Sequence, residues 1–83
     1  MFYCYILKSL LNSSYYMGSC EDVGKRIKFH NEKRVPSTKR YAPWVLVYQE
    51  NFDTLSQARK KELQIKSRKS RIAVEKLIKH FKV

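Results

Sequence analysis

Hydrophobic and polar positions divide the chain into short extended segments and longer helical ones. Phe2–Leu7 is mostly aromatic or aliphatic, which favours a buried or half-buried strand. Alternation places Tyr3, Tyr5 and Leu7 on one face of this strand and the intervening residues on the other. A second strand is predicted over Tyr15–Ser19, after a short polar stretch, so the two strands should form a hairpin.

A third strand and a basic loop are predicted in the middle of the chain. Trp44–Tyr48, WVLVY, is a continuous apolar run, as expected for a strand covered on both faces. Lys33–Pro43 contains four cations and two prolines without periodicity, which indicates a loop suited to phosphate contacts.

Helical periodicity predicts three helices. Ser19 and Asp22 have the S-x-x-D spacing of a capping box, so the first helix should begin there and carry Arg26 and His30 beside its buried face. A second helix is predicted from Asp53 or Thr54 to about residue 66, and a third over residues 72–81. The resulting fold class is α/β in the broad sense, or more narrowly α+β.

Glu62 is the one acidic residue without an ordinary explanation. It lies in the middle of the apolar stripe of the second predicted helix. Because burial of an unpaired carboxylate is costly, Glu62 should either pair with a cation, such as Arg26 or a lysine, or bind a metal ion.

Composition limits the classes of partner and the cellular location that are expected. The 83 residues predict a single domain over 1–83, and the net charge of +11 favours a polyanionic partner, with nucleic acid ahead of a membrane surface. Cys4 and Cys20 are too few for a disulfide framework, so we expect reduced thiols and a cytoplasmic location. The apolar N-terminal run is too short for a signal or membrane segment.

Several catalytic classes are disfavoured by the residues present. Seven scattered acids do not predict a cluster of metal-binding carboxylates, and no nucleophile-elbow or P-loop pattern occurs. The tyrosines have an ordinary alternative as core residues, and Arg26 as a side chain that extends to solvent. Residue chemistry alone therefore predicts a basic α/β domain with an unexplained carboxylate.

A family resemblance extends this interpretation. Four features follow one another: the run Tyr3-Cys4-Tyr5, the run Tyr16-Met17-Gly18, Arg26 with His30 four residues later, and the segment Ala58–Lys66, ARKKELQIK. Together they resemble the GIY-YIG endonuclease superfamily, in particular its small stand-alone bacterial members related to the nuclease domain of the excision-repair incision enzyme. Tyr3 replaces the usual glycine, and Ser19 stands where some repair enzymes have a lysine.

The resemblance implies a fold and an active site. The fold would be a small three-stranded antiparallel sheet flanked by helices, three in this chain. The catalytic residues would be Tyr5, Tyr16, Arg26, His30 and Glu62, with Glu62 holding one Mg²⁺ or Mn²⁺ ion. Either tyrosine could be the general base, and it would have to be acidified by adjacent cations because a free tyrosine has a pKa near 10.

The implied function is metal-dependent hydrolysis of DNA phosphodiester bonds, with structure-selective cutting in repair or recombination. Phosphate contacts are expected from exposed basic residues, namely Lys25, Lys33, Arg34, Lys39 and Arg40. RNA remains an alternative substrate, and a separate protein could target the cut. Two other hypotheses stay open: a catalytically weak nucleic-acid-binding module, and a basic structural component of a larger particle.

Overall fold

The three predicted strands form one antiparallel sheet with the N-terminal strand in the middle. The computed structural model describes residues 1–67 and 71–81. Its strands are β1 (Phe2–Ser9), β2 (Tyr15–Cys20) and β3 (Trp44–Phe52), in the spatial order β2-β1-β3. The β2 and β3 strands are therefore the two edges of the sheet.

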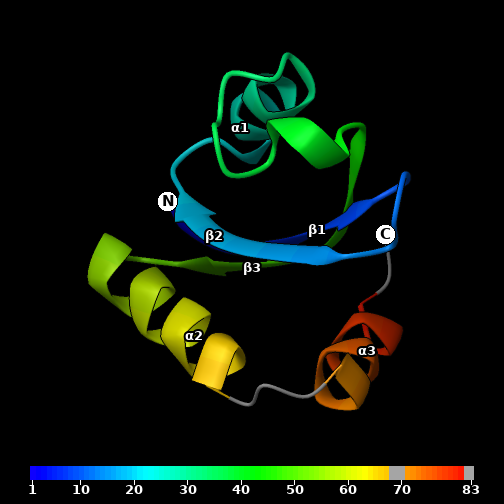
Figure 1. The fold of residues 1–83 in the computed structure, drawn as a ribbon. Helices are drawn as coiled ribbons and strands as arrows, with labels where there is room; N and C mark the ends of the chain where they lie inside the picture. Colours follow the sequence, from blue (N-terminus) through cyan, green and yellow to red (C-terminus); the bar gives the residue numbers. More distant parts are fainter. Residues whose placement is uncertain (68–70, 82–83) are drawn as a thin grey trace.

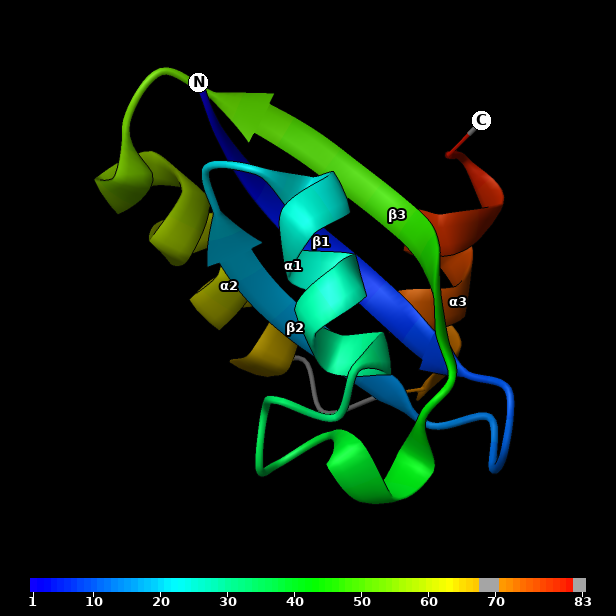
Figure 2. The ribbon, with the colours of Figure 1, turned by 90° about the horizontal axis from the view of Figure 1, so that it is seen from above.

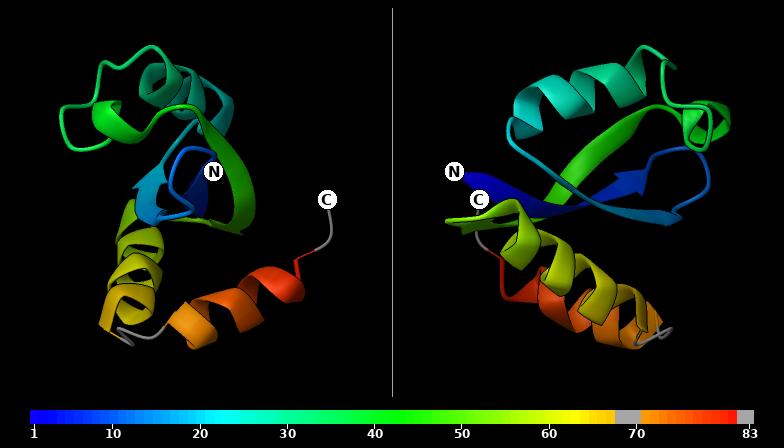
Figure 3. Two further views of the ribbon diagram at one scale, coloured as in Figure 1. Left: turned by 45° about the vertical axis from the view of Figure 1, so that its right-hand side comes forward. Right: turned by 90° about the vertical axis from the view of Figure 1, so that its left-hand side faces the viewer.

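Helices cover both faces of this sheet. The helix α1 (Val23–Asn31) lies on one face, and α2 (Leu55–Ser67) and α3 (Arg71–Lys79) lie on the opposite face (Figures 1 and 2). A short 3₁₀ helix, η1 (Lys39–Tyr41), lies within the basic loop, which is on the α1 side of the molecule (Figure 3). The α+β class and the expectation of three flanking helices are confirmed.

Alternation along β1 gives each face its own hydrophobic core. Tyr5 and Leu7 are buried toward α1, whereas Cys4 and Ile6 are buried toward α2 and α3. All four side chains are at most 1% exposed. The predicted division of the strand into two faces is thus confirmed, and it decides which side chains can reach which helix.

The first helix begins differently from the prediction. Asp22 is its N-cap, and the Asp22 carboxylate accepts a hydrogen bond from the Lys25 backbone N–H at 3.0 Å. Ser19 still belongs to β2, so the predicted capping box is wrong. Both Ser and Asp are good N-caps, and the S-x-x-D spacing does not distinguish a reciprocal box from a single cap.

Two other helix and loop boundaries are set by side-chain hydrogen bonds. The Thr54 hydroxyl accepts from the Gln57 backbone N–H at 3.2 Å, which confirms Thr54 among the two predicted caps of α2. At the far end of the basic loop, the Asn31 side chain accepts from the Trp44 N–H at 2.6 Å and donates to the Trp44 carbonyl at 3.1 Å. The end of α1 is thereby fixed to the start of β3.

The two cysteines lie in the protein interior as thiols. Cys4 and Cys20 are both free and buried. No helix within residues 1–67 and 71–81 has the length and apolar character that a membrane span requires.

Candidate active site

The site is built around a close contact between Tyr5 and Gly18. These residues are directly opposite each other in the β1–β2 ladder. A Cβ atom on Gly18 would lie 2.5 Å from the Tyr5 hydroxyl oxygen and 2.7 Å from its ring carbon Cζ. No side chain fits in that space, so glycine is required for the Tyr5 ring to cross β2 at this level.

His30 and Tyr16 complete the group beneath α1. His30 Nε2 lies 3.3 Å from the Tyr5 hydroxyl, within hydrogen-bonding distance. The Tyr16 and His30 rings are 4.9 Å apart between centroids. Because Arg26 is one helical turn before His30, β1, β2 and α1 together bring four of the predicted site residues to one place.

Burial controls the protonation of this group. It raises the pKa of Tyr5 to about 12, although the neighbouring Arg26 guanidinium acts in the opposite direction. Burial outweighs the effect of Arg26, so Arg26 by itself does not acidify Tyr5. Burial, followed by the positive charge of Arg26, lowers the pKa of His30 below its usual value, so the imidazole is neutral at pH 7.

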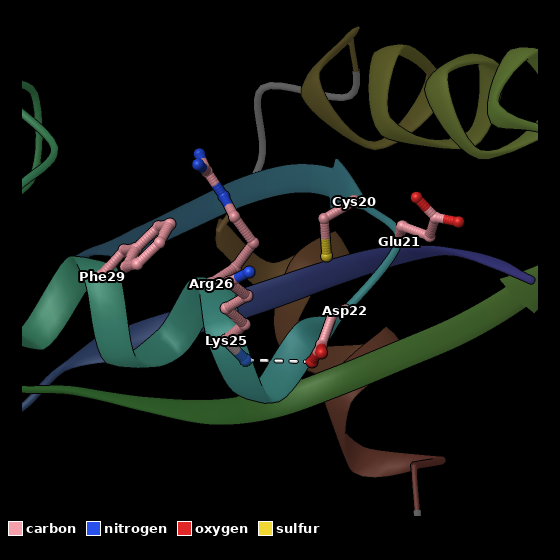
Figure 4. Close-up of a pocket in the computed structure, with 6 residues that line it drawn as sticks. All are labelled: Cys20, Glu21, Asp22, Lys25, Arg26 and Phe29. Atoms are coloured by element: carbon pink, nitrogen blue, oxygen red, sulfur yellow. Dashed lines mark hydrogen bonds between the residues drawn. The ribbon is translucent and has the colours of Figure 1, made fainter.

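Arg26 has an unusual environment for a cation. Its Nε atom is buried and has no hydrogen-bond partner among residues 1–67 and 71–81, although the nearby Tyr5 hydroxyl raises the pKa of the guanidinium. Figure 4 shows the Arg26 side chain extending from α1 with its guanidinium turned away from Asp22. A buried donor without a partner is a rare feature that calls for an explanation.

A groove of about 570 Å³ opens beside Arg26. Its walls come from the end of β2 and the first turns of α1 (Figure 4), and the lining residues are Cys20, Glu21, Asp22, Lys25, Arg26 and Phe29. Lys25 and Arg26 supply two cations to this groove, and two carboxylates, Glu21 and Asp22, also line it. The Asp22 carboxylate is engaged as the helix cap.

Glu62 lies on the other side of β2. It projects from α2, where one carboxylate oxygen accepts from the Ser19 hydroxyl at 2.7 Å and the other from Lys66 Nζ at 2.7 Å. The side chain is 17% exposed. The carboxylate is thus paired with a lysine, one of the two expected outcomes, and the edge strand β2 lies between it and the face that carries Arg26.

The side chains around Glu62 determine which metal ions could bind there. The described part of the chain contains no group of three or more His, Cys, Asp or Glu side chains placed to hold an ion. A single carboxylate does fit Mg²⁺ or Mn²⁺, because such ions retain waters and take further oxygen ligands from substrate phosphates. An ion here would have to displace Lys66 from the carboxylate.

The predicted phosphate-binding cations lie on the α1 side. Lys25, Lys33, Arg34, Lys39 and Arg40 are all exposed. Arg34 is already engaged, since its Nε lies 3.0 Å from the Glu32 carboxylate and its guanidinium lies over the Phe29 ring. The other four cations are directed to solvent from α1 and the loop that follows it.

The sequence did not predict two contacts with site residues, which are made by Ser19 and Thr38. Ser19 holds Glu62, and Thr38 lies 2.7 Å from His30 Nδ1 through its hydroxyl oxygen. Strand alternation could have identified Ser19, because it shares the α2-facing side of β2 with Tyr15 and Met17. Thr38 lies in a loop without periodicity, and no sequence signal marks it.

Comparison with known proteins identifies the family. A model of the GIY-YIG catalytic domain matches residues 1–77. UPF0213 proteins of Staphylococcus saprophyticus and Staphylococcus haemolyticus are 46% and 44% identical over 66 residues, covering 78% of this chain and 79% of each relative.

A solved structure agrees with this assignment. The UPF0213 protein BH0048 of Bacillus halodurans, determined by solution NMR, is similar with a TM-score of 0.59 and 32% identity, over 95% of this chain and 84% of that one. The chain therefore belongs to the GIY-YIG catalytic domain family, within its small UPF0213 group, and this membership implies nuclease activity.

Proposed function

We propose that this protein is a DNA endonuclease that uses one divalent metal ion, Mg²⁺ or Mn²⁺, and cuts at the free edge of β2. The observation that carries the proposal is Arg26, which lines the groove, lies close to Tyr5 and Tyr16 and has a buried Nε without a hydrogen-bond partner among the described residues. The proposal includes a cytoplasmic setting, structure-selective cutting in repair or recombination, and a separate protein that targets the cut.

Arg26 is proposed to bind the scissile phosphate. A guanidinium always remains charged and offers donors in a planar fork that matches phosphate oxygens. Its Nε is already buried without a hydrogen-bond partner among the described residues, so part of the cost of removing the guanidinium from water is met before a phosphate binds. Charge neutralisation at the phosphate also stabilises the transition state, in which negative charge accumulates on the non-bridging oxygens.

Tyr16 is proposed as the general base. Tyr5 is only 1% exposed and its pKa is raised to about 12, so it neither reaches solvent water nor ionises readily. Tyr16 is partly exposed and lies on the same face of the sheet, next to the His30 ring. It can therefore meet an attacking water near Arg26, while the rings of Tyr5 and His30 pack against its own ring.

Glu62 would hold the metal ion, which when bound would supply positive charge to the phosphate and the leaving oxygen. The Ser19 hydroxyl keeps this carboxylate next to β2. An exchange of Lys66 for the ion leaves the carboxylate charged and paired in both states, so it is never buried without a counter-charge.

A specific observation favours the rival function, a nucleic-acid-binding module with weak catalysis. Lys66 occupies one Glu62 oxygen at 2.7 Å, and a carboxylate that stays bound to lysine would not recruit a metal ion. Both functions predict DNA binding that weakens steeply with salt. The two functions differ in whether the protein cleaves the DNA that it binds.

The test is nicking of duplex, branched and single-stranded DNA with Mn²⁺ or Mg²⁺. Glu62→Gln should abolish metal-dependent nicking and leave DNA binding nearly intact. Glu75→Gln is a matched control, because Glu75 is 52% exposed on α3 and its ion pair is with Arg71; it should nick like the wild type. Equal cleavage by Glu62→Gln would remove Glu62 from the mechanism, and absence of nicking by the wild type on every DNA would favour the binding module.

A further inference from the structure

Thr38 is a buried polar residue whose contacts are directed at the candidate site. It is 1% exposed. Its hydroxyl oxygen lies 2.7 Å from His30 Nδ1 and 3.4 Å from the Val35 carbonyl oxygen, and its own carbonyl accepts from Trp44 Nε1 at 3.0 Å. The hydroxyl is therefore held in place by the loop around it.

The positions of the protons follow from the donors and acceptors available. Arg26 can only donate, and its guanidinium interacts with the Tyr5 hydroxyl, which raises the pKa of Arg26; the Tyr5 oxygen therefore presents a lone pair to it. The single hydroxyl proton of Tyr5 is then directed at the other neighbour, His30 Nε2, at 3.3 Å. Nε2 of a neutral imidazole accepts that proton only when Nδ1 carries the ring proton.

The protonation of His30 Nδ1 also determines the role of the Thr38 hydroxyl. A protonated Nδ1 needs an acceptor because it is fully buried, and the Thr38 oxygen at 2.7 Å is in position. The Thr38 hydroxyl proton is then free to point at the Val35 carbonyl. The contacts of Tyr5, His30 and Thr38 are thus all satisfied with one consistent placement of protons.

We propose that Thr38 is a positioning residue, which holds His30 as the Nδ1–H tautomer and thereby turns the lone pair of the Tyr5 hydroxyl toward Arg26.

The opposite tautomer shows what Thr38 prevents. With the proton on Nε2, His30 would donate to the Tyr5 oxygen, and the Tyr5 hydroxyl proton would lose His30 as its acceptor. The Thr38 hydroxyl would have to turn its proton from the Val35 carbonyl toward His30 Nδ1. A buried Tyr5 donor that has lost its acceptor is unfavourable.

The arrangement also connects the basic loop to the site. Thr38 immediately precedes η1, which carries the exposed cations Lys39 and Arg40. A loop conformation that moves Thr38 changes the acceptor available to His30. The catalytic consequence rests on the proposed nuclease function, whereas the tautomer itself does not.

The tautomer is measured by ¹⁵N NMR of the histidine ring nitrogens, since protonated and unprotonated ring nitrogens have different chemical shifts. The chain has two histidines, and His80→Gln leaves His30 as the only signal. In that background we expect a protonated Nδ1 and an unprotonated Nε2, retained in Thr38→Ser and lost or mixed in Thr38→Val. A protonated Nε2 in the parent, or an unchanged spectrum in a folded Thr38→Val, overturns the proposal. If Thr38→Val does not fold, Thr38→Ala removes the same hydroxyl without its bulk and provides the same test.

Nicking in the same variants tests the catalytic consequence. Thr38→Val should lower the rate by roughly 10²-fold, the low end of what misdirected acid–base groups cost, and Thr38→Ser should restore it to within about threefold of wild type. An altered tautomer with an unchanged rate would contradict the link to catalysis. Absence of nicking by the wild type would instead refute the proposed function and leave the NMR result standing.

Discussion

The two faces of the sheet differ in the polar groups that they bury, although they share the same strands. The face under α2 and α3 buries an apolar cluster that includes Cys4, Ile6 and Ile65. The face under α1 also has apolar core residues, but it buries the imidazole of His30 and the hydroxyls of Tyr5 and Thr38 among them.

This difference suggests that the α2 and α3 face contributes mainly to folding stability, whereas the α1 face holds most of the proposed site residues. Apolar burial stabilises the fold without directional requirements, whereas each buried polar group under α1 has to be hydrogen-bonded in a particular direction. The α1 face therefore has the more fixed arrangement of polar groups, as the proposed phosphate site requires. The β2 strand divides the two regions, and Glu62 reaches it from the apolar side through Ser19.

The largest effect should come from a cavity on the apolar face. Ile65 is 3% exposed, and Ile65→Ala should lower the free energy of unfolding by about 2–5 kcal/mol, measured by urea denaturation. Leu63→Ala on the exposed side of α2, where Leu63 is 65% exposed, should change it by less than about 0.5 kcal/mol. At a low temperature, where Ile65→Ala is still folded, its nicking rate per folded molecule should equal that of the wild type. A lower rate would contradict the view that this face contributes to stability and not to cleavage.

A somewhat smaller effect is expected from the opposite change, an added methyl group on the α1 face. Gly18→Ala places a Cβ 2.5 Å from the Tyr5 hydroxyl and should cost about 1–3 kcal/mol of stability. It should also disturb the ¹⁵N signals of His30. Gly24→Ala is the matched control, because its Cβ meets only the Asp22 carboxylate at 3.6 Å, and it should stabilise α1 by up to about 1 kcal/mol. Similar melting temperatures for the two variants would contradict the close contact.

The pH dependence of stability should come from His30. Its folded pKa is lowered from 6.5, so below pH 6.5 the unfolded chain binds more protons and stability falls as pH decreases. Above pH 6.5 this contribution is constant. The slope should not exceed about 1.4 kcal/mol per pH unit, should persist in His80→Gln, and should disappear between about pH 5 and 6.5 in His30→Gln. Unfolding followed by circular dichroism measures it, and an equal slope in His30→Gln would assign it elsewhere.

The smallest effect concerns DNA binding by the loop. Lys39→Ala and Arg40→Ala should each reduce the slope of log affinity against log salt by about 1. Lys79→Ala, which removes an exposed cation from α3, should leave that slope unchanged. Fluorescence anisotropy with a short duplex provides the measurement, and a reduction only in Lys79→Ala would place the DNA on the other face.

Much of the fold follows from local pattern. Alternation of apolar residues along β1 assigns Tyr5 and Cys4 to opposite faces, and helical periodicity identifies Glu62 as an acidic residue in an apolar stripe. The roles proposed for Arg26 and His30 depend on family resemblance, because an arginine and a histidine four residues apart are ordinary on any helix.

The remainder depends on contacts that no local pattern encodes. Thr38 meets His30 only because the basic loop folds back over α1, and the raised pKa of Tyr5 results from its burial by several elements at once. The wrong prediction for Ser19 has a related reason. Its hydroxyl is equally suited to a helix cap and to Glu62, and only the tertiary structure decides between them.

The most direct test of the division between the faces uses two neighbouring tyrosines on β2. Tyr16 faces α1 and Tyr15 faces α2 and α3, so the same substitution removes a hydroxyl from each side in turn. With Mn²⁺ and the preferred DNA, Tyr16→Phe should lower the nicking rate by roughly 10²-fold or more, and Tyr15→Phe should stay within about twofold of wild type. Equal losses in the two variants, or a loss confined to Tyr15→Phe, would contradict a site on the α1 face.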